Sequence, residues 1–195
     1  MIPFPDKKFK IIYADPPWSY NDKMSGHGMG AETHYPTQDT QWIKSLPVKD
    51  ISEKDSVLFM WAVSPLLPEA FEVINSWGFK YKTVAFCWVK TTKNGLVSNM
   101  GRWTMGNIEI CLLATKGKPK RKKRDVKQLV LAQRTVHSKK PLEVRKRISD
   151  LMGQASAIEL FARQSVEGWE VWGNETDKLD AEKQMTIFNH EGVKR

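Results

Sequence analysis

Short apolar runs recur along this chain, and they constrain its fold more than any other feature of the sequence. Six of them, each four to seven residues long, occupy residues 9–14, 57–63, 83–89, 108–114, 129–132 and 157–162. Their mixture of Ile, Val, Phe and Trp predicts strands that are buried on both faces. Two intervening segments have the periodicity of amphipathic helices that end at a glycine: residues 65–78 and 141–153.

Buried strands that alternate with amphipathic helices are typical of an α/β fold with an open, largely parallel sheet. In such a fold, ligands bind in loops beyond the carboxyl ends of the strands. The 195 residues, of which 41% are hydrophobic, are enough for one domain with a substantial core. We therefore predict a single domain over residues 1–176, followed by a polar tail over residues 177–195.

Membrane and secretory proteins are disfavoured by the apolar segments. The longest apolar run, residues 57–63, is far shorter than the roughly 20 residues of a membrane-spanning helix. Residues 1–8 lack the basic and apolar segments of a secretory signal, so we expect a cytoplasmic protein. Cys87 and Cys111 lie within apolar segments, which favours buried thiols over a disulfide or a zinc site.

Positive charge is concentrated in one segment. The formal net charge is +9, and residues 116–127 contain eight basic residues against one acidic residue, Asp125. Within this segment, Lys120, Arg121, Lys122, Lys123 and Arg124 are consecutive. Such a run predicts a polyanionic partner, above all the phosphates of nucleic acid. A solvated loop or a localisation signal is the alternative interpretation.

The sequence Asp15-Pro16-Pro17-Trp18 follows the first apolar run and carries the clearest chemistry. The prolines restrict the backbone and lack N–H groups. We therefore expect the carbonyl oxygens beside the Asp15 carboxylate to face a ligand in a fixed direction, without N–H donors that compete for it. Trp18 offers a flat face for stacking. This combination suits the exocyclic amine of a planar base such as adenine, which only acceptors can bind. A strand-ending turn with Trp18 in the core is the alternative.

Further blocks, in the same order, make the chain similar to the MT-A70-like adenine-N6 methyltransferases, the family of the catalytic subunit of the messenger-RNA adenosine methyltransferase. Besides Asp15-Pro16-Pro17-Trp18, the blocks are at residues 34–37, 46–48, 58–61, 77–79, 88–90, 109–117, 138–141, 159–163 and 168–175. Together they span about residues 9–175. The resemblance is greatest to prokaryotic and phage-type members.

The resemblance implies a Rossmann-like, class I S-adenosylmethionine-dependent methyltransferase sandwich. Its motif order is permuted, so that the catalytic strand comes early and the cofactor strand late. S-adenosylmethionine is the implied cofactor, and no metal is expected. By matching positions, Asp15 lies near the methionine end of the cofactor and the target amine, and Lys140 faces the cofactor carboxylate or the substrate. Phe161 and Arg163 follow the cofactor strand, and Asn174 and Glu175 reach the ribose.

Adenine in DNA is the predicted substrate, with an extruded base held between Trp18 and Tyr35 and its amine bonded to Asp15 and the Pro16 carbonyl. The other predicted substrate contacts are Tyr20, His34, Trp103, Asn107, Glu109, Lys120, Arg121, Lys122, Lys123 and Arg124. An RNA substrate and a non-catalytic subunit of a methyltransferase complex are the alternatives. A homodimer and a complex with a partner subunit are both compatible with the sequence.

Overall fold

The computed structural model of the chain describes residues 2–19, 38–99, 103–134 and 139–173. Its strands are β1 (Phe9–Ala14), β2 (Ser52–Ala62), β3 (Lys80–Thr92), β4 (Gly95–Leu96), β5 (Ile108–Lys116), β6 (Leu129–Gln133), β7 (Ala157–Leu160) and β8 (Glu170–Trp172). Its helices are α1 (Thr40–Ser45), the 3-10 turn η2 (Ser64–Leu66), α2 (Leu67–Ser76) and α3 (Leu142–Met152).

The strands form one eight-stranded mixed sheet. Its order is β4-β3-β5-β2-β1-β7-β8, with β6 paired to β3. Strand β5 runs antiparallel to both neighbours, β2 and β3, and β4 runs antiparallel to β3, whereas the other pairs are parallel. The α/β class is therefore confirmed, but the expectation of a largely parallel sheet needs correction. An apolar run indicates that a strand is buried but not in which direction the strand runs. The sequence therefore could not reveal the reversal of β5.

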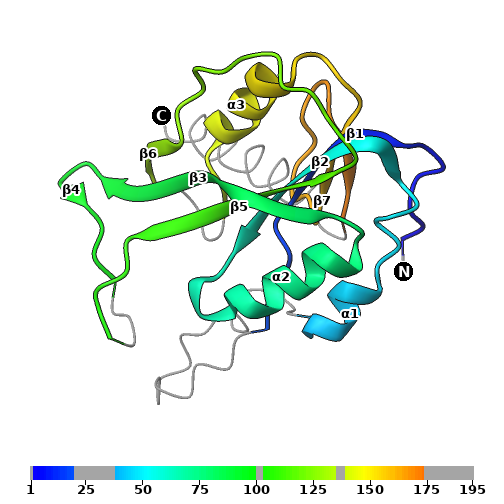
Figure 1. Cartoon of the computed structure of the whole chain (residues 1–195). Helices are drawn as coiled ribbons and strands as arrows, with labels where there is room; N and C mark the ends of the chain where they lie inside the picture. Colours follow the sequence, from blue (N-terminus) through cyan, green and yellow to red (C-terminus); the bar gives the residue numbers. More distant parts are fainter. Residues whose placement is uncertain (1, 20–37, 100–102, 135–138, 174–195) are drawn as a thin grey trace, which may run out of the picture.

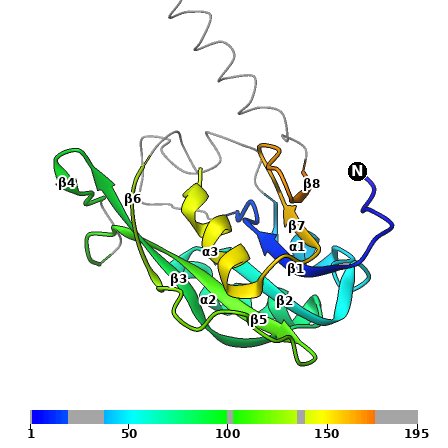
Figure 2. The same cartoon turned by 90° about the horizontal axis from the view of Figure 1, so that it is seen from above.

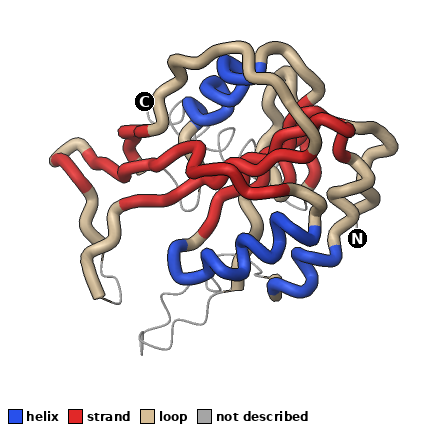
Figure 3. The backbone as a smooth tube through the Cα atoms, viewed as in Figure 1, coloured by secondary structure: helices blue, strands red, loops and turns tan. Residues whose placement is uncertain are grey.

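Helices cover both faces of this sheet (Figures 1 and 3). Helices α1 and α2 pack on one face, over a core that includes Ile43, Ile74 and Trp77. Helix α3 packs on the other face, where Val144 and Ile148 join a second core, and Figure 2 shows it lying over the strands. None of the described helices is long and apolar enough to cross a membrane. Cys111 is buried and Cys87 half-buried, and both are free thiols.

Two strands are longer than their apolar runs predict. Strand β2 begins five residues before residue 57, with Glu53, Lys54 and Asp55 in its first half, and β3 begins at Lys80 rather than Thr83. Lys54, Asp55 and residues 80–82 are exposed at the amino ends of the strands, where charged and polar side chains remain in water, whereas Ser52 and Ser56 are buried. Hydrophobicity therefore located the buried middle of each strand and missed its solvated start.

Strand β7 is shorter than predicted, because the backbone changes direction at Phe161. This residue has φ of 61°, in the left-handed region that bulky side chains rarely adopt. Gly173, after β8, lies directly against this bend. A Cβ at Gly173 would lie 2.7 Å from the Ala162 carbonyl oxygen and 2.8 Å from the Ala162 nitrogen, so only glycine fits. The close approach holds the β7–β8 connection beside the carboxyl end of β1.

Candidate active site

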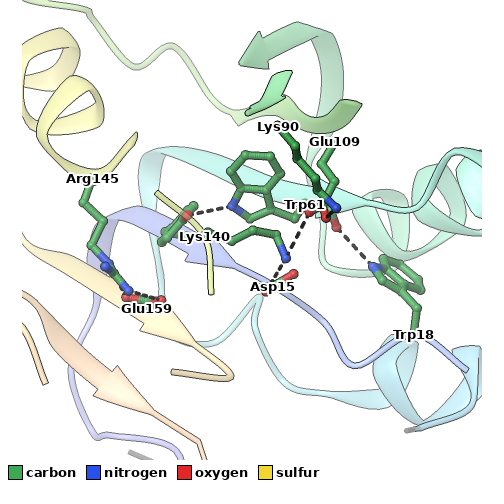
Figure 4. A network of polar contacts seen from close by, with 9 residues as sticks. Asp15, Trp18, Trp61, Lys90, Glu109, Lys140, Arg145 and Glu159 are labelled. Carbon is green, nitrogen blue, oxygen red and sulfur yellow. Dashed lines mark hydrogen bonds and ion pairs between the residues drawn. The ribbon is translucent and has the colours of Figure 1, made fainter. Parts of the chain in front are cut away.

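Four charged side chains from distant parts of the sequence meet at the carboxyl edge of the parallel strands. Asp15 follows β1, Lys90 lies near the end of β3, and Lys140 lies two residues before α3. Glu109 is the second residue of β5. Because β5 is antiparallel, its beginning lies at the edge where β1 and β3 end. The reversal of β5 thus brings Glu109 to the same edge as Asp15 (Figure 4).

The four groups alternate in charge. The Lys140 Nζ lies 2.7 Å from Asp15 Oδ2 and 3.3 Å from Glu109 Oε2. The Lys90 Nζ lies 2.5 Å from Glu109 Oε1. Lys140 is the most enclosed of the four, with 12% of its side chain exposed against 26% for Asp15. Its ammonium also lies 5.4 Å from the centre of the Trp61 ring, a cation–π contact. Lys140 therefore holds both carboxylates in place.

The two carboxyl groups have opposite pKa shifts. Burial raises the pKa of Asp15 above its usual range, although Lys140 opposes the shift. Burial also acts to raise the pKa of Glu109, but Lys140 and Lys90 together outweigh it and hold that pKa below its usual range. Glu109, with two cationic neighbours, is thus firmly ionised. Asp15, whose pKa is raised, is therefore the first of the two carboxylates to take up a proton as the pH falls.

The two prolines of the motif are arranged differently from the prediction. The Pro16 carbonyl accepts a hydrogen bond from the Trp18 N–H at 2.9 Å, and the Pro17 carbonyl accepts one from the Gln38 N–H at 2.8 Å. The prediction of carbonyls without competing donors is therefore wrong. Each oxygen still has a second lone pair, so either can accept another donor.

Trp18 packs in the core, as in the alternative interpretation of the motif. It is 5% exposed, and its indole N–H donates to the Trp61 carbonyl at 3.1 Å. A side chain enclosed in this way has no free face for a base, so the predicted stacking role of Trp18 is corrected to a packing role. Its hydrogen bond ties the Asp-Pro-Pro-Trp segment to the end of β2, which keeps Asp15 in place.

A hollow that opens to solvent lies beside Asp15. Its lining residues are Asp15, Lys139, Lys140, Arg145, Glu159, Phe161, Arg163 and Gln164. The structure thus brings together four of the predicted cofactor residues: Asp15, Lys140, Phe161 and Arg163. Carboxylates and cations face the same space, which suits a ligand that carries both signs of charge.

A buried ion pair, which the sequence analysis did not include among the site residues, lies at one side of this hollow. The Arg145 guanidinium of α3 bonds both oxygens of Glu159 in β7, at 2.6 and 2.7 Å, and these residues are 8% and 6% exposed. Arg145 also lies 5.8 Å from the centre of the Tyr13 ring. The Tyr13 hydroxyl in turn accepts the indole N–H of Trp61 at 2.6 Å, below Lys140.

These contacts connect the Arg145–Glu159 pair to Lys140 through the packed side chains of Tyr13 and Trp61. The sequence did contain a signal for this pair. Glu159 lies inside an apolar run, and Arg145 follows Val144 in the apolar stripe of a helix. A charged residue in such a position needs a buried partner of opposite charge. Lys90 was likewise missed as a site residue, although it follows the apolar run that ends at residue 89.

The other predicted site residues lie elsewhere or outside the described residues. Asn107 is half-buried, and its carbonyl accepts the Lys90 N–H at 2.9 Å, so it lies near Glu109. Trp103 is 98% exposed. Five predicted contacts fall outside the described part of the chain: Tyr20, His34, Tyr35, Asn174 and Glu175. In the described ranges, no group of three or more His, Cys, Asp or Glu could hold a metal ion.

The α/β fold with a mixed sheet, and the Asp-Pro-Pro-Trp segment after its first strand, agree with the resemblance to adenine methyltransferases, and comparison with known proteins identifies the family. The model of the MT-A70 family matches residues 9–175, and the chain belongs to this family. A type II methyltransferase, M.MunI from Mycoplasma sp, is 38% identical over 189 residues, which cover 88% of this chain and 79% of that protein. The family resemblance found in the sequence is therefore confirmed.

Two eukaryotic relatives are more distant and longer. An MT-A70-like N(6)-adenosine-methyltransferase of Arabidopsis thaliana is 27% identical over 172 residues, 86% of this chain but 24% of that protein. The N(6)-adenine-specific methyltransferase METTL4 of Mus musculus is 27% identical over 191 residues, 89% of this chain and 38% of that protein. The chain thus matches only a part of these proteins.

Proposed function

We propose that this chain is a DNA methyltransferase that transfers a methyl group from S-adenosylmethionine to the N6 amine of adenine. The observation that carries the proposal is the Asp15 carboxylate, held by Lys140 at 2.7 Å, at the mouth of a hollow with mixed charge. DNA is favoured over RNA because the chain is similar over most of its length to a type II methyltransferase, M.MunI. RNA remains the substrate to test beside it.

The chemistry of adenine explains why such an acceptor is needed. The lone pair of the N6 amine is delocalised into the ring, so the amine is a poor nucleophile. A carboxylate that accepts an N6–H bond favours the tetrahedral nitrogen of the transition state, and this stabilisation increases as positive charge develops there. In our proposal, the Asp15 carboxylate accepts a hydrogen bond from one N6–H group. The second lone pair of the Pro16 carbonyl accepts a hydrogen bond from the other. Asp15 orients the amine and need not remove a proton during the transfer. The methylated nitrogen would then release its extra proton to water, while the sulfur that gives up the methyl group would become a neutral thioether.

The hollow has the donor chemistry that the cofactor requires. S-adenosylmethionine supplies an activated methyl group on a positive sulfonium, next to an amino acid end with one ammonium and one carboxylate. Asp15 offers an anionic contact for the positive groups, and Lys139, Lys140 and Arg163 offer cations for the carboxylate. We assign the methionine end to these residues and to Phe161. Asn174 and Glu175 remain the proposed ribose contacts.

The proposal extends to the architecture and to the predicted substrate contacts. The catalytic strand β1 comes first and the cofactor strand β7 comes late in the chain, as a permuted class I methyltransferase requires. Residues 1–176 form the proposed methyltransferase domain, which agrees with the family match over residues 9–175, and residues 177–195 are the tail. Tyr20, His34 and Tyr35 remain proposed contacts to the base, and Trp103 and Asn107 to the strand. Its phosphates are the proposed partners of five cations in the connection from β5 to β6: Lys120, Arg121, Lys122, Lys123 and Arg124.

The proposed function is tested by methyl transfer from labelled S-adenosylmethionine to unmodified duplex DNA, single-stranded DNA and RNA, with nucleoside mass spectrometry of the products. We expect N6-methyldeoxyadenosine from a DNA substrate. N6-methyladenosine found only in RNA would assign the enzyme to the other substrate class. Failure to bind S-adenosylmethionine, together with no product on any substrate, would favour a non-catalytic subunit.

The pH dependence of the rate tests the role of Asp15. Because the carboxylate is the active form and burial raises its pKa, activity should fall on acidification at a higher pH than for an ordinary aspartate. The Lys140 cation lowers this pKa and the Glu109 anion raises it. In profiles of kcat/KM against pH, Lys140→Ala should therefore move the acidic limb to higher pH and Glu109→Gln to lower pH. A limb that neither variant moves would contradict the assignment.

A further inference from the structure

Lys90 is the end of the row of charged groups that begins at Asp15. Its Nζ lies 2.5 Å from Glu109 Oε1, whereas Lys140 contacts the other oxygen, Oε2, at 3.3 Å. Figure 4 shows Lys90 and Glu109 side by side. In the described part of the chain, no ion pair joins Lys90 directly to Asp15. Any influence of Lys90 on Asp15 through contacts therefore passes through Glu109 and Lys140.

Two tryptophan rings support the two lysines of the row. The Lys90 ammonium lies 5.4 Å from the centre of the Trp88 ring, and the Lys140 ammonium lies 5.4 Å from that of Trp61. The two rings contact each other edge to face, with their centres 6.4 Å apart. Both are 2% exposed, and each indole N–H has a hydrogen-bond partner. Rings packed and bonded in this way do not shift easily, so the two cations rest on a rigid surface.

The backbone of Lys90 is fixed as well. Its N–H donates to the Asn107 carbonyl at 2.9 Å, and its carbonyl accepts the Val97 N–H at 2.9 Å. These bonds continue the pairing of β3 with β5 one residue beyond Val89. The side chain is 18% exposed, so its ammonium is only partly screened by water. Lys90 is thus a cation held at a set place in the sheet, beside Glu109.

The proposed reaction places conflicting demands on Asp15 and its neighbours. Asp15 must be ionised and must offer an oxygen to the N6 amine, although Lys140 lies 2.7 Å from the same carboxylate. Glu109 gives Lys140 a second anionic partner, but the Glu109 charge also raises the pKa of Asp15. A cation beside Glu109 offsets both its pull on Lys140 and its field at Asp15. Lys90 occupies that position.

We propose that Lys90 is a positioning residue for methyl transfer, which holds the Glu109 carboxylate so that Lys140 stays shared between Glu109 and Asp15 and Asp15 stays ionised to accept the target amine. This inference rests on the proposed function. The other charged groups that act on Asp15 are Lys140, Glu109 and Arg163, and Arg145 and Glu159 line the same hollow. Lys90 acts on this set through Glu109 alone.

Profiles of kcat/KM against pH for the full chain test this role. Lys90→Met keeps the aliphatic stem and removes the charge, so Asp15 should take up its proton at higher pH. On the acidic limb, its kcat/KM should fall about threefold to tenfold below the wild type, with a smaller loss on the alkaline plateau. Lys90→Gln should repeat this result, and Lys90→Arg should restore the wild-type profile. Lys82→Met, which removes an exposed cation at the start of the same strand, is the matched control and should leave the profile unchanged.

The double variant K90M/E109Q tests the path of the effect. If Lys90 acts through Glu109, then Lys90→Met should change the acidic limb much less in the Glu109→Gln background than in the wild type. Equal changes in both backgrounds would overturn the proposal, since Lys90 would then act without Glu109. A rate that falls equally at every pH, together with a lower Tm, would overturn it as well, because a purely structural role has that signature.

A second measurement needs no turnover. The Asp15 carboxyl carbon is titrated by NMR in protein with ¹³C-labelled aspartate, and its signal is assigned by its absence from Asp15→Asn. Lys90→Met should raise the pKa of Asp15 above that of the wild type, and Lys90→Arg should not. The two proposals can therefore fail separately. A raised pKa without product on any substrate defeats only the proposed function, and product with an unchanged pKa defeats only the role of Lys90.

Discussion

Replacing Asp15 with Ala is expected to lower kcat/KM for methyl transfer by about 10² to 10³ or more, the usual effect of losing a group that stabilises the transition state. The variant should still fold for two reasons. Lys140 keeps Glu109 as a partner at 3.3 Å. Alanine also carries no charge, so the burial that raises the pKa of Asp15 has no cost at this position in the variant. Initial rates on unmodified duplex DNA and a thermal unfolding curve measure the two effects.

Asp15→Asn is the matched control. It keeps the size and one acceptor oxygen of the side chain but removes the negative charge. We expect its rate to lie between those of the wild type and Asp15→Ala, with the acidic limb of the pH profile lost. Turnover by Asp15→Ala at the wild-type rate would exclude the mechanism, even if the protein methylates adenine.

Replacing Glu159 with Gln is expected to lower the free energy of unfolding by about 3–5 kcal/mol, because it leaves the buried Arg145 cation without its anion. The double variant R145M/E159L should recover most of this loss, since two apolar side chains leave no buried charge unpaired. Urea unfolding of the wild type, both single variants and the double variant measures the coupling of the pair.

The pair of half-buried Arg147 and exposed Glu143 in the same helix is the reference. Its ion pair of 2.6 Å spans one helical turn, and Glu143→Gln should cost no more than about 0.5 kcal/mol. Equal losses for Glu143→Gln and Glu159→Gln would mean that burial does not set the cost. The double variant should also lose methyl transfer if Arg145 and Glu159 are needed to shape the hollow beside Asp15.

The sequence determined the elements of the fold and the central motif of the site. Apolar runs and helical stripes located β1, β2, β3, β5, β6, β7, α2 and α3, because burial requires apolar residues wherever these elements meet the core. Asp-Pro-Pro-Trp marked Asp15, because the motif follows a buried strand and matches the signature of the family. The matching blocks placed Lys140, Phe161 and Arg163 beside it.

The tertiary structure decided which residues share an edge of the sheet. Residue types report burial and local turns, but the direction of a strand depends on the partners with which it pairs. The reversal of β5 is the clearest case: it puts Glu109 within 3.3 Å of Lys140 and Lys116 at the amino edge of the parallel strands. The packing of α3 on β7 likewise created the Arg145–Glu159 pair, since a charge is stable in a core only where the fold supplies its partner.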